Sequence, residues 1–235
     1  MKVLNMGAGV QTTAILLEFW KDYDLVLMAD TGDEHPETYE YIENYLKPFC
    51  QSKNLEWKTV KKEETLLEYC LRKKSFPLMS RRFCTQDFKI RVIQKELRKR
   101  GATKKNPITC SIGFSLDESH RANFNSDRKY QKFDYPLLDR NLTRRDCYEI
   151  IKKHGFPVPI KSGCYYCPYQ SRKKFQILNV EHPELFEKAL QLEEESTLFP
   201  KYNLNGKYPL RSIISNKSLD DFIPEDSCDS GHCFV

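Results

Sequence analysis

Hydrophobic and polar residues form two alternating kinds of segment over the first 60 residues. Continuous apolar runs cover 2–6 and 25–29, which is the length of a buried strand, and 56–60 is a third candidate strand. Within 12–23 and 36–52, apolar residues recur at helical spacing. Strands that alternate with helices are typical of βαβ units, so the pattern predicts an α/β fold with a parallel sheet.

The alternation continues less regularly along the chain. Residues 61–100 are helical in pattern and strongly basic, 107–114 and 133–137 are candidate strands, and 143–154 is a candidate helix. Beyond Pro157 the character changes to a Cys-x-x-Cys loop, helical patterns and a turn-rich tail. We therefore predict a main domain over 1–160 and a smaller region of loop, helices and cysteine-containing tail over 161–235.

Composition agrees with a packed protein. The chain has 235 residues, of which 40% are hydrophobic, and this is enough to bury a core. No apolar run reaches the roughly 18–20 residues that span a bilayer, and residues 1–6 lack the features of a signal peptide. The sequence predicts a cytoplasmic protein without a membrane partner.

The nine cysteines fall into two groups. In a reducing compartment structural disulfides are rare, so grouped cysteines favour metal, cluster or redox chemistry. One group lies in apolar, periodic surroundings and is expected to be buried in the core: Cys50, Cys70, Cys110 and Cys147. The other group lies in loop-like surroundings: Cys84, Cys164, Cys167, Cys228 and Cys233.

Cys164 and Cys167 form the strongest local motif. Gly163 precedes the pair and Pro168 closes it, so the two thiolates can chelate one metal centre. Cys228 lies in the tail and is a candidate further ligand. The residues alone leave an iron–sulfur cluster, tetrahedral zinc, a redox pair and inert thiols as alternatives.

A glycine-rich turn joins the first predicted strand to the first predicted helix. Such a turn presents backbone N–H groups at a helix N-terminus, which is a geometry that binds phosphate. The candidate residues are Gly7, Ala8, Gly9, Gln11, Thr12 and Thr13. A tight turn without a ligand is the alternative. Asp30 and Thr31 follow the second strand, where open α/β sheets bind ligands.

Four segments, in this order, resemble the phosphoadenosine-phosphosulfate (PAPS) reductase branch of the PP-loop, or adenine nucleotide alpha hydrolase, superfamily. Residues 7–13 are similar to the PP-loop, whose usual form is Ser-Gly-Gly-x-Asp-Ser. Residues 30–39 read Asp-Thr-Gly, three variable residues and Pro-Glu-Thr-Tyr. Residues 113–121 resemble an acidic and arginine-containing strand end, and Pro136-Leu137 with the following helix completes the order over about 2–170.

This resemblance implies a three-layer PP-loop domain with a mainly parallel sheet and a small C-terminal helical region. It also implies ATP or a related adenine nucleotide as cofactor, with Mg²⁺ as a further candidate. Nucleotide contacts are then expected from a second set of residues: Gly113, Asp117, Glu118 and Arg121. In the loop itself, Gly7, Ala8 and Gln11 stand where the family usually has serine, glycine and aspartate.

Residues 82–89 are similar to the Cys-Cys…Lys segment of the cluster-bearing adenylylsulfate reductases. Cys84 matches the first cysteine, Thr85 replaces the second, and Lys89 keeps the basic position. The resemblance implies a four-iron four-sulfur (4Fe-4S) cluster on Cys84, Cys164 and Cys167, with Cys228 as a candidate fourth ligand and zinc as the alternative metal.

Three residues are candidate catalytic groups by the same resemblance. They are Lys89, Asp33 beside the second strand, and Cys233, whose tail is weakly similar to the C-terminal nucleophilic cysteine of the sulfonucleotide reductases.

The net charge of +5 is unevenly distributed, because basic residues crowd into 81–105. This segment is interpreted either as a solvated helix face, as a surface that contacts tRNA or DNA, or as a clamp on a sulfonucleotide. A homodimer or a larger complex is a further candidate state.

The leading functional hypothesis is an enzyme that binds an adenine nucleotide and transfers sulfur to a nucleic acid with the help of ATP. A reductase of PAPS or adenylylsulfate is the second hypothesis. The third is a non-enzymatic accessory subunit that binds nucleotide and metal within a nucleic-acid modification or defence complex.

Overall fold

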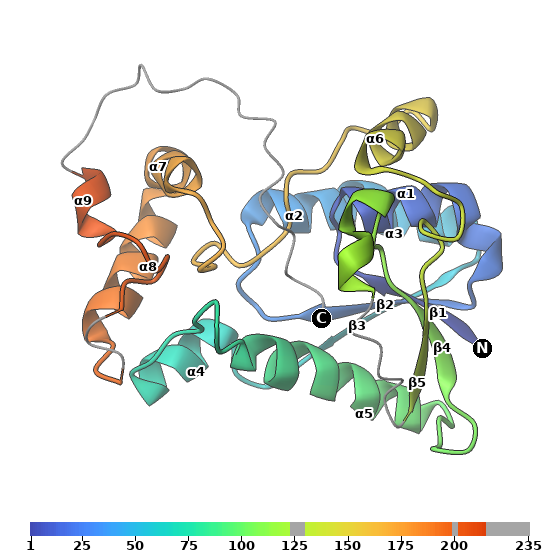
Figure 1. Cartoon of the computed structure of the whole chain (residues 1–235), viewed down its shortest axis with the longest axis horizontal. Helices are drawn as coiled ribbons and strands as arrows, with labels where there is room; N and C mark the ends of the chain where they lie inside the picture. The colour runs from blue at the N-terminus through green and yellow to red at the C-terminus, as the bar shows by residue number, and fades with distance from the viewer. Residues whose placement is uncertain (123–129, 199–201, 215–235) are drawn as a thin grey trace.

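A computed structural model describes residues 1–122, 130–198 and 202–214 (Figure 1). Within these residues five parallel strands form one sheet in the order β3-β2-β1-β4-β5. The strands are β1 (Lys2–Met6), β2 (Leu25–Asp30), β3 (Glu56–Lys61), β4 (Ile108–Ser111) and β5 (Gln131–Asp134). The predicted three-layer α/β class is confirmed.

Helices join consecutive strands and continue beyond the sheet. The α-helices are α1 (Val10–Phe19), α2 (Pro36–Tyr41), α3 (Lys47–Ser52), α4 (Leu66–Lys73), α5 (Arg91–Lys99), α6 (Arg144–Lys153), α7 (Arg172–Glu181), α8 (Pro183–Glu195) and α9 (Arg211–Ile214). Short 3-10 helices are η1 (Trp20–Asp22) and η4 (Leu116–Arg121), and π-helical segments are η2 (Ile42–Leu46) and η3 (Thr85–Ile90).

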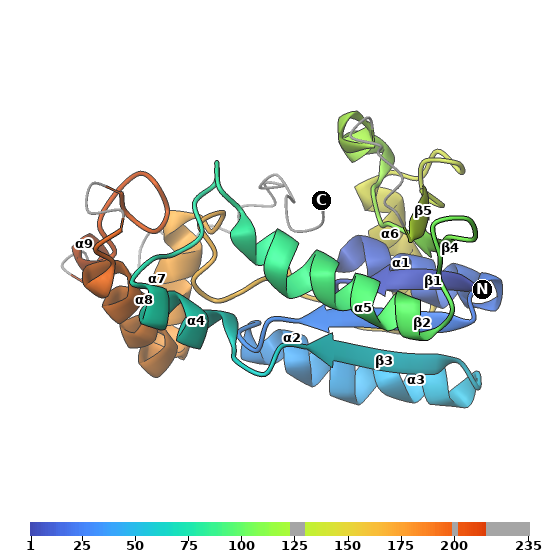
Figure 2. The ribbon, with the colours of Figure 1, turned by 90° about the horizontal axis from the view of Figure 1, so that it is seen from below.

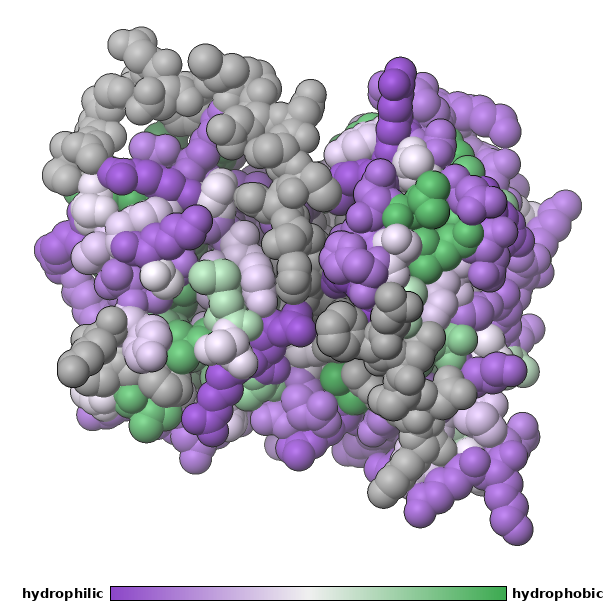
Figure 3. Space-filling view, viewed as in Figure 1, coloured by the Kyte–Doolittle hydropathy of each residue, from purple (hydrophilic) through white to green (hydrophobic). Residues whose placement is uncertain are grey.

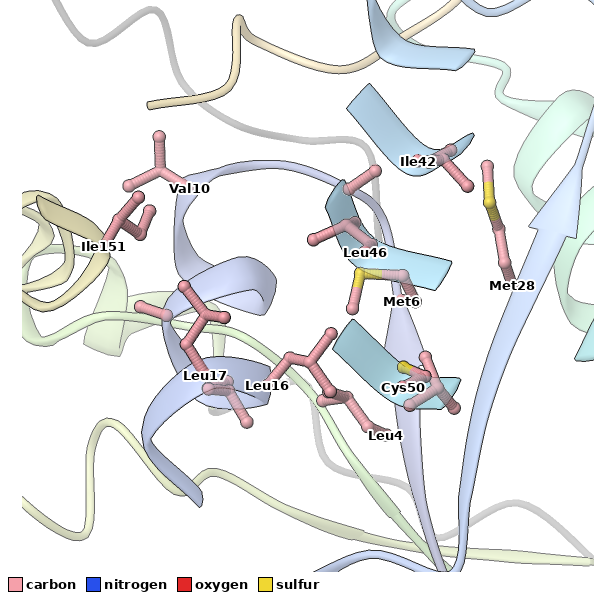
Figure 4. Packing of buried hydrophobic residues seen from close by; sticks show 14 of the residues in the cluster. Leu4, Met6, Val10, Leu16, Leu17, Met28, Ile42, Leu46, Cys50 and Ile151 are labelled. Carbon is pink, nitrogen blue, oxygen red and sulfur yellow. The ribbon is translucent and has the colours of Figure 1, made fainter. Parts of the chain in front are cut away.

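Each face of the sheet has its own hydrophobic core, because successive side chains of a strand point to opposite faces. Leu4 and Met6 of β1 pack with α1, the α2–η2–α3 run and α6 on one face (Figure 4). Val3 packs on the other face with Ile93 and Leu97 of α5 (Figure 2). Burial on both faces explains why β1 and β2 read as continuous apolar runs.

A third hydrophobic cluster lies beside the sheet domain and joins α4 with α7, α8 and α9 (Figure 1). Its fully buried aromatic side chains include Phe76, Phe88, Tyr166, Phe175 and Phe186. Because α4 and Phe88 precede residue 160, this cluster draws on both sides of the predicted boundary. The division at residue 160 stays a prediction.

The basic segment between 61 and 100 contains two helical parts rather than one continuous helix. Helix α4 ends at Lys73 and is followed by Lys74, whose backbone is left-handed with a φ of 49°. The second helical part, η3 with α5, begins at Thr85. Cys84 was expected in a loop, yet its backbone is helical and it directly precedes η3. Because the backbone is helical from Cys84 through η3, the spatial separation of Cys84 and Lys89 is set by helix geometry.

The surface is mainly hydrophilic on the face seen in Figure 3, with hydrophobic residues in small groups. In the described part of the chain, no helix combines the length and the apolar character needed to cross a bilayer.

Candidate functional site

The carboxyl ends of β1 and β4 form the topological switch point of the sheet. From β1 the chain moves outward through β2 and β3, and then returns to the opposite side of β1 with β4. Loops that leave two such strands diverge and open a crevice, which is where open α/β sheets bind ligands. The loop after β1 contains Gly7, Ala8 and Gly9, and the loop after β4 contains Gly113.

The loop after β4 contacts the first turn of α1, which directly follows the glycine loop. A Cβ atom added at Gly113 would lie 2.9 Å from Thr12 Cγ2 and 3.2 Å from the backbone nitrogen of Thr12. A side chain at Gly113 would therefore displace the first turn of α1. The sequence grouped Gly113 with the glycine loop through a resemblance, and the structure brings both to one place.

The glycine loop leaves the start of α1 open to a ligand. Gly9 is the N-cap of α1 and supplies no side chain to the first N–H groups of the helix. Ala8 has a φ of 55°, in the left-handed region that favours glycine. Thr12 donates its hydroxyl to the Gly9 carbonyl at 3.3 Å, and the Thr13 hydroxyl is buried without a partner among the described residues.

Gln11 binds an ion pair that is distant in sequence, which is formed by Glu118 and Arg121. Its Nε2 donates to Glu118 Oε2 at 3.0 Å, and Arg121 Nη1 donates to Glu118 Oε1 at 2.6 Å. Arg121 is only 6% exposed, and its Nε and Nη2 have no hydrogen-bond partner within the described ranges. The guanidinium lies 4.4 Å from the centre of the Phe114 ring. A buried cation with unpaired donors is suited to an anionic ligand.

Asp117 binds the N-terminus of α6 and does not take part in the contacts of Gln11, Glu118 and Arg121 described among these residues. Its Oδ2 accepts the backbone N–H of Arg144 at 2.6 Å, at the start of α6. Carboxylates are stabilising at helix N-termini, so the side chain of Asp117 ties η4 to α6. Its predicted contact with the nucleotide stays a prediction.

The end of β2 is shaped by hydrogen bonds of Asp30. Its Oδ1 accepts the Tyr39 hydroxyl at 2.7 Å and the Gly32 N–H at 2.8 Å. Gly32 has a φ of 84°, and a Cβ there would meet Thr65 Cγ2 at 2.6 Å. This turn therefore requires glycine. Thr31 and Asp33, on either side of Gly32, both contact the Cys-x-x-Cys loop.

The Cys-x-x-Cys loop pairs with the segment after β2. The Tyr165 N–H donates to the Asp33 carbonyl at 3.1 Å, and the His35 N–H donates to the Gly163 carbonyl at 3.2 Å. Glu34 and Cys164 form the antiparallel bridge between them. Thr31 and Cys164, which meet across these segments, are 133 residues apart in sequence, so only the tertiary fold makes this contact.

Asp33 is held by groups from both sides of this contact. Its Oδ2 accepts the Tyr166 hydroxyl at 2.8 Å and the Leu67 N–H at 2.7 Å. Burial raises the pKa of Asp33 to about 6, and the two hydrogen bonds oppose that rise. A carboxyl group with such a pKa can hold or release a proton near neutral pH.

Cys164 lies beside a buried ion pair. Its Sγ is 3.2 Å from Thr31 Oγ1, and Lys89 Nζ is 3.6 Å from Glu34 Oε1. Burial raises the pKa of the Cys164 thiol well above its ordinary value, the charge of Glu34 raises it further, and Lys89 lowers it. The candidate catalytic residues Asp33 and Lys89 thus lie in one region with Cys164.

The three candidate ligands of the iron–sulfur cluster have different surroundings. Cys84 and Cys164 both contact the third hydrophobic cluster. Cys167 lies one tight turn from Cys164, because its N–H donates to the Cys164 carbonyl at 2.9 Å. Cys228 and Cys233 lie outside the described residues. The four cysteines that were expected in the core are buried, as predicted.

Three neighbours of the site were not identified from the sequence. Ser162 Oγ would lie 3.2 Å from a Cβ at Gly9, so Ser162, which precedes the Cys-x-x-Cys motif by two residues, lies against the glycine loop. Tyr166 binds Asp33, and Glu34 pairs with Lys89. No local pattern marks these residues, although Glu34 stands inside a motif segment and could have been considered on that ground.

Comparison with known proteins adds no assignment: no family model matches the chain, and a search of curated proteins gave no match. The resemblance to PP-loop proteins therefore rests on the motifs themselves.

The residues of the site fit both implied groups. Gly9 and Gly113 form a cradle that a Cβ atom would fill, and the unpaired donors of Arg121 are suited to phosphate. Three thiols are soft donors that suit iron–sulfur chemistry better than a hard cation. Gln11 replaces the carboxylate of the usual loop, and the contact with Glu118 returns a carboxylate to this position.

Proposed function

We propose that this protein binds ATP at the switch point of its sheet and transfers sulfur to a nucleic acid with the help of an iron–sulfur cluster on Cys84, Cys164 and Cys167. The observation that carries the proposal is the contact between Ser162 and Gly9. It brings the loop of candidate sulfur ligands against the loop that is suited to phosphate.

The chemistry has two steps. The acceptor attacks the α-phosphate of ATP and releases pyrophosphate, and sulfide then displaces AMP from the adenylated acceptor. When bound, the cluster would supply a soft site for that sulfide. In the chain itself, the first turn of α1 and Arg121 would bind phosphate. Lys89 would keep positive charge beside Cys164. Asp33, with its raised pKa, would accept or donate a proton.

A test of nucleotide binding uses Gly9. Its φ of −95° is accessible to any residue, so Gly9→Val adds a side chain without backbone strain. We expect calorimetry on metal-replete protein to give an affinity for ATP at least about tenfold lower for the variant. The control is Gln51→Val, because Gln51 is exposed near the end of α3, the helix that precedes the amino end of β3. Equal affinities of Gly9→Val and the unaltered chain would contradict the proposal.

The same protein separates sulfur transfer from sulfonucleotide reduction. Transfer predicts release of pyrophosphate from ATP that depends on added tRNA or DNA. Reduction predicts instead release of sulfite from PAPS or adenylylsulfate with a thiol reductant. Nucleotide binding without either reaction would favour the accessory subunit.

A further inference from the structure

The connection between α6 and α7 contains a buried charged group that the proposed reaction does not use. Lys161 lies three residues before Cys164 on this connection. Its Nζ is closed off from solvent and has no hydrogen-bond partner among the described residues. An ammonium group that has left water without gaining an acceptor is costly, because nothing compensates its charge. Its positive charge suits an anionic ligand.

The neighbours of Lys161 in the chain hold it beside the glycine loop. The Gly163 carbonyl accepts the His35 N–H at 3.2 Å, which binds the connection to the segment after β2. Ser162 Oγ would lie 3.2 Å from a Cβ on Gly9. Lys161 directly precedes Ser162, and its Nζ is buried within the molecule rather than extended into solvent. The charge is therefore only one residue away from the contact with the glycine loop.

Other polar groups without partners belong to the same crevice. Thr13 in the first turn of α1 and Ser115, two residues after Gly113, are both 0% exposed. Their hydroxyls have no hydrogen-bond partner in the described part of the chain, and the same holds for Nε and Nη2 of Arg121. The crevice thus combines hydroxyl, guanidinium and ammonium donors that lack acceptors. A phosphate group, with several acceptor oxygens, can satisfy such donors together.

We propose that Lys161 binds the phosphates of the nucleotide at the glycine loop, together with Arg121 and the first turn of α1. Lysine is suited to this role, because its ammonium is a point charge with three donors on a flexible stem. The inference rests on the proposed nucleotide site. It adds to that site a residue outside the four segments that carry the resemblance to PP-loop proteins.

This role predicts opposite effects of one substitution on stability and on binding. Methionine is long, flexible and uncharged, so Lys161→Met removes the uncompensated charge and keeps an apolar side chain in its place. The nucleotide-free variant should melt about 2–4 °C above the unaltered chain, because a buried charge without a partner destabilises the fold. Its affinity for ATP should fall by about tenfold or more, because a charge-assisted hydrogen bond to phosphate is lost. Thermal denaturation and calorimetry on the full chain measure the two effects.

Lys152→Met is the matched control. Lys152 is exposed near the end of α6, shortly before the same connection, and its Nζ is 3.4 Å from Oε1 of the exposed Glu149. The variant loses the same charge as Lys161→Met, but an exposed ion pair contributes little to stability. Its melting temperature and its affinity for ATP should therefore remain those of the unaltered chain.

The two measurements separate the possible outcomes. A higher melting temperature with weaker ATP binding, in Lys161→Met and not in Lys152→Met, supports the assignment. Equal ATP affinities of Lys161→Met and the unaltered chain overturn it but leave the proposed nucleotide site intact. A fall in both quantities also overturns it, because Lys161 would then act through the stability of the fold. An unaltered chain that binds no ATP contradicts the proposed function, and this inference with it.

Discussion

At the scale of single residues, the ion pair of Arg121 with Glu118 places one positive and one negative charge at the switch point of the sheet. Both side chains are buried, and Gln11 holds the second carboxylate oxygen. Buried ion pairs lose much stability when one partner is removed, because the other is left without compensation. The same arrangement leaves Nε and Nη2 of Arg121 without partners among the described residues, and these are the atoms that the proposed function pairs with phosphate.

Replacement of Arg121 by methionine should therefore destabilise the protein strongly. The expected loss in the free energy of unfolding is about 3–5 kcal/mol, measured by urea denaturation without nucleotide. The double variant Arg121→Met with Glu118→Gln should recover part of this loss, because no unpaired charge remains buried.

Arg140 provides the comparison. Its guanidinium also lies over an aromatic ring, at 4.2 Å from the centre of Phe19, and pairs with Asp22 at 3.5 Å, but both charged groups are exposed. Arg140→Met should cost no more than about 1 kcal/mol. Similar losses at Arg121 and Arg140 would show that burial of the ion pair does not matter.

At the scale of elements, α5 has two different faces. Ile93 and Leu97 pack on the sheet, whereas Lys95, Arg98 and Lys99 are exposed. Not all basic residues of the segment are equivalent, because Arg100 binds Glu56 and Glu96. Lys89, which the sequence counted with the basic surface, is buried beside Glu34. The solvated-face interpretation and the nucleic-acid interpretation thus concern the same outward face of α5.

Charge reversal at Arg98 and Lys99 distinguishes these two interpretations. If α5 contacts phosphates, the double variant to glutamate should bind tRNA or DNA more weakly whatever the sequence. The slope of log affinity against log salt should fall in magnitude by about 1–2, because binding releases fewer counterions when fewer phosphates are contacted.

Lys152 and Lys153 supply the control for net charge, because they are exposed on α6. Their reversal to glutamate changes the total charge equally and should leave the slope unaltered. Equal effects of the two double variants would point to a general charge effect, and α5 would then be only a solvated face.

At the scale of the whole molecule, one loop joins the sheet to the helical region. The segment from Ser162 to Tyr166 contacts the glycine loop, pairs with Asp33 to His35, and packs its two tyrosines into the third hydrophobic cluster. Cys84, which directly precedes η3, packs against the same hydrophobic cluster. A cluster or metal bound by Cys84, Cys164 and Cys167 would therefore connect two separate segments of the chain, and its loss should lower the stability of the whole molecule.

Serine substitution of the candidate ligands tests this connection. After anaerobic purification, Cys84→Ser, Cys164→Ser and Cys167→Ser should each lower the iron and sulfide content and the melting temperature, because serine is a poor ligand for iron–sulfur clusters. Cys50→Ser and Cys147→Ser should keep full iron content, since these buried thiols lie within the core on one face of the sheet. Zinc in place of iron in the unaltered protein would favour the alternative metal, and unchanged iron in all three variants would refute the ligand set.

The sequence by itself determined most elements of the sheet domain, although β5 begins at Gln131, two residues before the predicted strand 133–137. Strands β1, β2 and β3 begin at the predicted residues. For β1 and β2 the reason is that strands buried on both faces are continuous apolar runs, whereas β3 is a largely exposed edge strand. Helix α6 follows Thr143, at the start of the predicted helix, and its capping pair of Thr143 and Asp146 is a local signal in the sequence. The order of strands and helices was sufficient to predict the parallel α/β class.

Only the tertiary structure decided which distant residues meet. The pairing of Glu34 with Cys164, the bond from Tyr166 to Asp33 and the contact of Gln11 with Glu118 each join segments more than 100 residues apart. Nothing in a local pattern encodes such a contact, because side chains of one site come from loops that the sheet order brings together. The helical geometry of Cys84 and the burial of Lys89 were missed for the same reason: neighbours from other segments, not nearby residues, determine their surroundings.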